Sequence, residues 1–207
     1  MLSYSTVDPD TLELLKNISS LSEMQDMRLV GGTSLALQYG HRKSIDLDFF
    51  GKLDIDKDVF DEILMGFGNV IRRKVTDTIR IYQINGVKVD FVDYRRYNWI
   101  REAKFEDGIC LASVEDIAAM KINAIEGRGT KKDFIDIYYL LKHFTLSKIL
   151  DFYKSKYPEH SCFRALISLS YFDDAEQQPM PYMFDDISWN EIKKTIEKEV
   201  YSYSVKS

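Results

Sequence analysis

Two aspartates one residue apart, Asp46 and Asp48, have the type and spacing that most directly suggest chemistry in this 207-residue chain. Alternate residues of a β-strand project from the same face, so a strand here would place the two side chains together, roughly 6.6 Å apart at the backbone. Two carboxylates on one face favour the binding of a divalent metal ion. The segment therefore predicts a metal site.

A third aspartate, Asp90, lies on a second predicted strand at 87–92, which follows the strong Asn-Gly hairpin signal at 85–86. The apolar residues of this strand alternate with it, so Asp90 would face the same side as Asp46 and Asp48. Three carboxylates on neighbouring strands suit two-metal phosphoryl or nucleotidyl transfer, with Asp90 as the base for the acceptor hydroxyl. The alternative for an isolated Asp-x-Asp is a pair of solvated strand-end residues, and the third aspartate favours the site.

Two glycines, Gly31 and Gly32, follow a short apolar strand predicted at 27–30. Glycine has no Cβ and tolerates left-handed dihedral angles, so the backbone can approach a phosphate closely here. Farther along, Lys121 and Arg128 are seven residues apart on one predicted helix face, where they could neutralise a triphosphate. An ordinary solvated helix face is the alternative. Metal and phosphate together indicate a nucleotide.

Hydrophobic periodicity and capping residues predict an α+β protein: a mixed-sheet core at 1–112, then a helical domain at 113–207. An aspartate N-cap at Asp8 opens the first helix, and Ser113 with Asp116 forms a capping box. The strand at 45–50 should turn Ile45 into the core. The expected helices lie at 9–22, 34–39, 56–67, 113–127, 130–141, 146–157, 162–172 and 190–201, the strands at 27–30, 45–50, 70–76, 78–84 and 87–92, and a loop at 173–186.

The composition, 45% hydrophobic and 13% aromatic, is that of a globular protein with a sizeable core. The sequence lacks an apolar run of about 20 residues and a basic-then-apolar leader, which predicts no membrane partner and a cytoplasmic location. Cys110 and Cys162 form no Cys-x-x-Cys motif, which argues against a disulfide framework or a zinc site. The net charge of −5 gives no global attraction to nucleic acid.

Two local basic clusters flank the strand of Asp90 and are candidate contacts for an acceptor. They comprise Arg72, Arg73 and Lys74, and Arg95, Arg96, Arg101 and Lys104. Pairing with neighbouring surface carboxylates is the alternative interpretation. The acceptor could be RNA, including a tRNA 3′ end, a protein hydroxyl or a small molecule. His41 and Arg42 follow a glycine, where they could place a cation beside the site. Alternatively, His41 is a turn residue and Arg42 pairs with a nearby carboxylate.

Two sequence blocks between about 30 and 141 carry a family resemblance. The first is Val30-Gly31-Gly32-Thr33-Ser34, Gly40-His41-Arg42, Ser44-Ile45-Asp46-Leu47-Asp48-Phe49-Phe50 and Val89-Asp90-Phe91; the second is Lys121-Ile122-Asn123-Ala124, Arg128, Lys132-Asp133 and Asp136-Ile137-Tyr138-Tyr139-Leu140. The first block resembles polymerase-β-like nucleotidyltransferases. Its finer spelling, with the second block, is similar to the AbiEii/AbiGii toxin family.

This resemblance implies a polymerase-β-like mixed sheet with flanking helices and a Mg²⁺- or Mn²⁺-dependent transfer of a nucleoside monophosphate from an NTP to RNA, tRNA, protein or a small molecule. It also implies the toxin of a toxin–antitoxin or phage-defence pair, with a cognate antitoxin. A catalytically weak binding protein acting through a partner is the alternative, which the three carboxylates disfavour.

The resemblance also implies roles for individual residues. Asp46, Asp48 and Asp90 would bind metal, Gly31, Gly32, Thr33 and Ser34 would cradle the triphosphate, Lys121 would contact phosphate, and Asp133 and Asp136 would position substrate or support Lys121. Many relatives in the superfamily have Gly-Ser where this chain has Gly31-Gly32, so a phosphate-binding hydroxyl would have to come from Thr33 or Ser34. The NTP is expected between the sheet half and the helical half.

Overall fold

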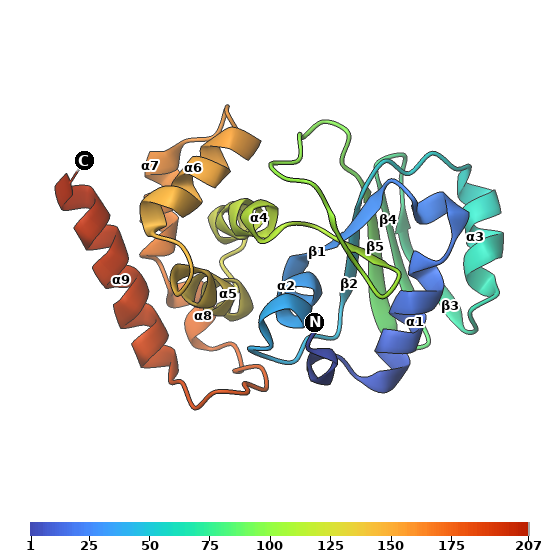
Figure 1. Ribbon diagram of the computed structural model, residues 1–207, viewed down its shortest axis with the longest axis horizontal. Helices are drawn as coiled ribbons and strands as arrows, with labels where there is room; N and C mark the ends of the chain where they lie inside the picture. The colour runs from blue at the N-terminus through green and yellow to red at the C-terminus, as the bar shows by residue number, and fades with distance from the viewer. Residues whose placement is uncertain (207) are drawn as a thin grey trace. The chain divides into compact units, whose positions relative to one another are not determined.

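The computed structural model describes residues 1–206, and the chain divides into two compact units (Figure 1). The first unit contains Met1–Asn98 and Glu102–Ala112. The second contains Trp99–Arg101 and the chain from Ser113 onward. Each unit has its own secondary structure and core, so each is described separately.

The first unit is built on a seven-stranded mixed sheet with an α+β arrangement. Its strands are β1 (Met27–Val30), β2 (Leu47–Gly51), β3 (Val70–Val75), β4 (Ile79–Ile84), β5 (Val87–Asp93), β6 (Lys104–Glu106) and β7 (Ile109–Leu111), and its helices are η1 (Tyr4–Thr6), α1 (Pro9–Ser19), η2 (Ser22–Met24), α2 (Gly31–Tyr39) and α3 (Lys57–Met65). The strand order is β3-β4-β5-β2-β1-β7-β6. The central pair β2–β5 is parallel, as is β1–β7, and the other neighbours are antiparallel.

Helices α1 and α3 cover one face of this sheet (Figure 1). The alternation of β2 and β5 sends Leu47, Phe49 and Phe91 into that core, where the Phe49 and Phe91 rings stack with centroids 5.6 Å apart. The intervening residues therefore face the opposite side. The prediction that Ile45 joins the core is wrong, because β2 begins only at Leu47 and the Ile45 side chain is 59% exposed.

Two hairpins of the sheet turn through an Xaa-Gly pair with both residues at positive φ. Asn85 and Gly86, with φ of 50° and 88°, join β4 to β5 as predicted. Asp107 and Gly108, with φ of 53° and 79°, join β6 to β7. The second hairpin was not predicted, because three residues are too few to show a strand pattern.

The starts of two helices in the first unit differ from the predictions, one in its capping bond and one in its boundary. Asp8 occupies the N-cap position of α1, but its carboxylate accepts from Lys43 Nζ at 2.8 Å and makes no side-chain capping bond. Helix α2 begins at Gly31 directly after β1, so the two glycines form its first turn and do not lie in a preceding loop.

The second unit is helical. Its helices are α4 (Val114–Gly127), α5 (Lys131–Leu141), α6 (Leu146–Lys156), α7 (Cys162–Leu169), α8 (Asp173–Glu176) and α9 (Trp189–Lys206). Helix α4 packs against α5, α6 and α7, and α9 packs against α5, α6 and α7. The region expected to be a loop at 173–186 includes the single turn α8.

The N-terminus of α4 binds the short segment that crosses into the second unit. Ser113 Oγ accepts from the Asp116 backbone N–H at 3.0 Å, which confirms half of the predicted capping box. The Asp116 carboxylate has a different role from the predicted one: it accepts from the Ile100 backbone N–H at 2.9 Å and pairs with Lys156 Nζ at 2.7 Å. Both charged side chains are fully buried, so this ion pair is part of the core.

Across residues 1–206, every helix is too short or too polar to cross a lipid bilayer. Cys110 and Cys162 are free thiols and half-buried.

Candidate active site

Two of the three predicted aspartates lie on the central parallel pair of strands. Asp48 on β2 and Asp90 on β5 are register partners, and neighbouring strands are about 4.8 Å apart. Both side chains leave the sheet on the face opposite the Leu47 and Phe91 core. Asp46 lies one residue before β2 begins, so its position depends on the preceding loop.

Gly31 brings the start of α2 against Asp48. Its φ is +69°, and a Cβ placed there would collide with the Asp48 carboxylate. Both the backbone conformation and the close approach therefore require glycine. The first backbone N–H groups of a helix have no intrahelical acceptor, and they favour anions such as phosphate. The α2 terminus thus combines an anion-binding end with an adjacent carboxylate.

Gly32 faces a buried guanidinium. A Cβ on Gly32 would collide with Nη2 of Arg42, whose Nη1 donates to the Lys43 carbonyl at 3.0 Å. Arg42 is almost fully buried, and Ser44 lies on the same side of Gly32. Arg42, predicted as a cation beside the site, thus lies against the glycine pair.

The hydroxyls of Thr33 and Ser34 point inward. Thr33 Oγ1 donates to the Asp46 carbonyl and lies 2.9 Å from Ser44 Oγ, and Thr33 is 1% exposed. Ser34 is fully buried, with its Oγ 3.3 Å from Gln38 Nε2. Thr33 therefore holds the backbone that carries Asp46, a positioning role that differs from the predicted phosphate contact.

Lys88 lies at the site but was not among the residues predicted for it. Its Nζ lies 2.5 Å from Asp90 Oδ2, while Asp90 Oδ1 is buried and has no hydrogen-bond partner in the described chain. Burial lowers the pKa of Lys88, but the hydrogen bond to Asp90 and the charges of Asp90, Asp48 and Asp46 outweigh it, so the pKa is raised. One ammonium and three carboxylates therefore form one electrostatic cluster. The sequence contained a signal for this residue, because Lys88 and Asp90 are two apart on a predicted strand and therefore project from the same face.

The ligand atoms of this cluster are suited to binding a cation. Its donors are carboxylate oxygens, one of them without a partner, and an ammonium already lies on Asp90. Residues 1–206 nevertheless contain no group of three or more His, Cys, Asp or Glu side chains arranged to hold a metal ion. The convergence of Asp46, Asp48 and Asp90 on one ion thus stays a prediction.

The predicted residues of the second block form a cluster inside the helical unit. Lys121 Nζ on α4 lies 2.9 Å from Asp133 Oδ1 and 2.6 Å from Asp136 Oδ2 on α5, and the Lys121 side chain is 6% exposed. Arg128 and Thr130 also bond Asp133, at 3.1 and 2.6 Å. Burial would raise the pKa of Asp133, but the charges and hydrogen bonds around it hold that pKa far below its usual value. The two carboxylates thus support Lys121, one of the two roles expected for them.

The two basic clusters are largely paired with nearby acids. Arg72 pairs with Asp61 and lies 3.7 Å from Asp58, Arg95 Nε lies 2.9 Å from both Asp93 oxygens, Arg101 lies 3.5 Å from Glu115, and Lys104 lies 2.8 Å from Glu106. Arg73 donates to Gln83, and Arg96 lies over the Tyr97 ring. The alternative of surface pairing therefore describes most of these cations.

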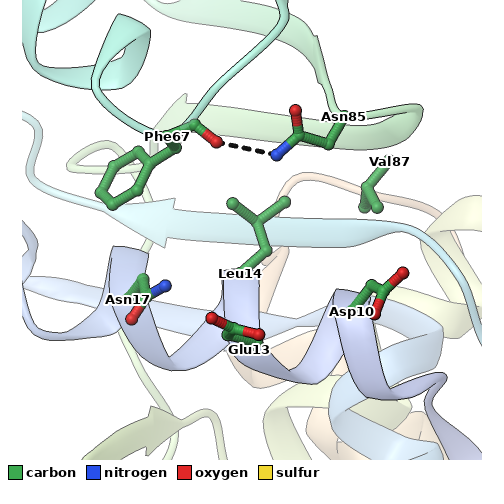
Figure 2. Close-up of a pocket in the computed structure, with 7 residues that line it drawn as sticks. All are labelled: Asp10, Glu13, Leu14, Asn17, Phe67, Asn85 and Val87. Carbon is green, nitrogen blue, oxygen red and sulfur yellow. Dashed lines mark hydrogen bonds between the residues drawn. The ribbon is translucent and has the colours of Figure 1, made fainter.

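A separate hollow of about 340 Å³ lies between α1 and the β4–β5 turn (Figure 2). In it the Asn85 side chain donates to the Phe67 carbonyl at 2.7 Å and accepts from the Asn69 backbone N–H at 2.9 Å. Its lining residues are Asp10, Glu13, Leu14, Asn17, Phe67, Asn85 and Val87. The site residues described above lie elsewhere.

Comparison with known proteins assigns the chain to a family. Residues 13–202 match the family described as the nucleotidyl transferase AbiEii toxin of type IV toxin–antitoxin systems. An uncharacterized protein of Aquifex aeolicus (strain VF5) is 34% identical over 200 residues, 92% of this chain and 94% of that protein.

Two solved structures share the fold. JHP933 from Helicobacter pylori has a TM-score of 0.51 and 20% identity, with 96% of this chain and 98% of that chain covered. MenT4, a nucleotidyltransferase toxin from Mycobacterium tuberculosis H37Rv, has a TM-score of 0.55 and 14% identity, with coverage of 93% and 81%. These likenesses confirm the predicted α+β fold, and the family match confirms the resemblance read from the sequence. The chain belongs to the AbiEii nucleotidyltransferase toxin family.

Proposed function

We propose that this protein transfers a nucleoside monophosphate from an NTP to an acceptor hydroxyl, using a catalytic core at 1–112 and a helical domain at 113–207. The observation that carries the proposal is the register pairing of Asp48 with Asp90, with the glycine start of α2 against Asp48. Carboxylates beside an anion-binding helix terminus suit a substrate with both metal and phosphate. The family supports the same chemistry.

In this reaction the acceptor oxygen bonds to the α-phosphorus of the NTP, and the bond from that phosphorus to the bridging oxygen of the β-phosphate breaks. Pyrophosphate leaves, and the acceptor proton passes to the Asp90 carboxylate. The backbone N–H groups of Gly31 and Gly32 bind the triphosphate. Thr33, whose hydroxyl also lies against Ser44 Oγ, fixes the backbone of Asp46.

Asp46, Asp48 and Asp90 would hold the metal ions, Mg²⁺ or Mn²⁺. When bound, these ions neutralise phosphate charge and acidify the acceptor hydroxyl. The partnerless Asp90 Oδ1 and the ammonium already on Asp90 support this assignment. Lys121 is proposed as a phosphate contact, which would require its ammonium to serve the substrate as well as Asp133 and Asp136.

The biological role we propose is that of a cytoplasmic toxin opposed by a cognate antitoxin, as the family description suggests. RNA, including a tRNA end, is the acceptor we favour, with a protein or small-molecule hydroxyl as the alternatives. Arg73 and Lys74, both exposed on β3, are the cations of the first basic cluster best suited to contact it. Transfer to RNA should fall with salt, and replacing both with alanine should flatten that dependence.

The test is to incubate the purified protein and MgCl₂ with each α-labelled NTP, with and without total RNA. Label on RNA, with pyrophosphate released in equal amount, supports the proposal. Label on the protein itself or on an added small hydroxyl compound would show that the acceptor is not RNA. The absence of labelling under every condition would overturn the proposed transferase activity.

A further inference from the structure

The face of the sheet that carries Asp48 and Asp90 already has one cation, the Lys88 ammonium. Lys88 Nζ lies 2.5 Å from Asp90 Oδ2, within charge-assisted hydrogen-bond distance. Lys88 and Asp90 are two residues apart on β5, so they share the face onto which the register partner Asp48 also projects. A metal ion bound by Asp48 and Asp90 would therefore lie close to the Lys88 ammonium, and the two positive charges would repel each other.

The contact is one that can be broken. The Lys88 side chain is 49% exposed, whereas that of Asp90 is 16% exposed. A lysine ammonium is strongly hydrated and sits on a flexible four-carbon stem, so it can leave a carboxylate for water at small cost. Asp90, in contrast, has its second oxygen buried without a hydrogen-bond partner among residues 1–206 and gains from any additional cation.

We propose that Lys88 is an exchangeable counter-ion of the metal site. It neutralises and orients Asp90 while the divalent ion is absent, and it releases Asp90 when the ion binds. This inference rests on the proposed function, because it assumes that Asp48 and Asp90 are metal ligands. Lys88 is thus a positioning residue that acts through Asp90, and its charge weakens metal binding to the nucleotide-free protein.

The test is a titration of the purified full chain with Mn²⁺ in the absence of nucleotide, with free Mn²⁺ followed by electron paramagnetic resonance. Lys88→Gln should bind Mn²⁺ about tenfold more tightly than the wild type, which corresponds to about 1.4 kcal/mol. Lys88→Arg, which keeps the charge, should bind like the wild type. Lys16→Gln is the matched control, since it removes an exposed lysine from α1, which packs on the opposite face of the same sheet, and should leave the affinity unchanged.

Thermal unfolding gives a second readout. Without metal, Lys88→Gln should melt below the wild type because Asp90 loses its paired ammonium, and Mn²⁺ should raise its melting temperature by more than it raises that of the wild type. If Lys88→Gln does not fold, Lys88→Met removes the charge while keeping the apolar stem. Either variant can decide the question.

Asp48→Asn separates the two claims. If Asp48→Asn weakens Mn²⁺ binding while Lys88→Gln and Lys88→Met bind no more tightly than the wild type, the counter-ion role is overturned and the metal site stands. If neither the wild type nor any variant binds Mn²⁺, or if Asp48→Asn binds Mn²⁺ like the wild type, the metal site of the proposed function fails. The role of Lys88 then fails with it.

Discussion

Lys121 and Asp136 form a buried ion pair on two successive helices, with Nζ 2.6 Å from Oδ2 and both side chains almost completely excluded from solvent. Buried charges that lose their partner are costly, because the remaining charge stays in a medium of low dielectric constant. Lys121 therefore stabilises the helical domain whatever its role toward the substrate. A loss of activity on its substitution would not by itself show that Lys121 contacts phosphate.

We predict that Lys121→Met lowers the free energy of unfolding by about 3–5 kcal/mol, because Asp133 and Asp136 would be left buried without their shared cation. Urea denaturation measures this cost. The double variant Lys121→Met with Asp136→Asn should recover part of it. Equal stability of Lys121→Met and wild type would contradict the structural role.

The substrate role of Lys121 has its own measurement. Mg²⁺ with NTP should raise the melting temperature of the wild type, because binding to the native state alone stabilises it. If Lys121 also contacts phosphate, this shift should be smaller in Lys121→Met under conditions where the variant is folded. An undiminished shift would leave Lys121 with the structural role only.

The helical domain should lose stability in acid through Asp133. Its pKa is lowered in the folded protein, so its contribution is present above its ordinary pKa of 3.8 and is lost as the pH falls from there toward the folded value. The free energy of unfolding of the wild type should fall steeply below about pH 4. Asp133→Asn should be less stable at neutral pH and less sensitive to acid, and an equally steep profile for the variant would contradict the assignment.

Gly31→Ala should abolish transfer and destabilise the protein by about 1–3 kcal/mol, since alanine would be strained at φ +69° and its Cβ would meet the Asp48 carboxylate. Gly108→Ala is the matched control. Gly108 has a similar φ of +79° with nothing near its Cβ position, so this variant carries the strain without the collision. Gly108→Ala should keep activity, and equal activity of the two variants would remove Gly31 from the site.

Thr33→Val should reduce the rate of transfer by about tenfold or more while leaving NTP-induced stabilisation nearly intact, because Thr33 holds the Asp46 backbone. Thr33→Ser keeps the hydroxyl and should retain most activity. Loss of NTP stabilisation in Thr33→Val, restored in Thr33→Ser, would instead return Thr33 to the triphosphate cradle.

Local rules predicted much of the central sheet. The Asn85-Gly86 turn and the alternation after it placed Asp90 on one face and Phe91 on the other, and the structure confirms both. The same turn chemistry at Asp107-Gly108 was overlooked, because its flanking strands have only three residues each. Ile45 was misplaced because a period-two pattern does not say where a strand begins.

The features that could not be predicted from the sequence depend on contacts between residues far apart in the chain. Nothing in local patterns pairs Lys156 with Asp116, forty residues apart, or turns the Thr33 hydroxyl toward Asp46. The sequence therefore suggested a substrate role for Thr33, and only the structure adds its bond to the Asp46 backbone. The phosphate contact of Lys121 stays a prediction, and its pairing with Asp133 and Asp136 was one of the two roles expected for those carboxylates.

The most direct test of the central claim is transfer from α-labelled NTP to RNA by the wild type and by Asp48→Asn and Asp90→Asn. Each variant removes one of two neighbouring like charges, so both should remain folded, with melting temperatures close to the wild type. We expect labelled RNA and pyrophosphate from the wild type, and none above background from either variant. Full activity in a folded Asp48→Asn or Asp90→Asn variant would contradict it.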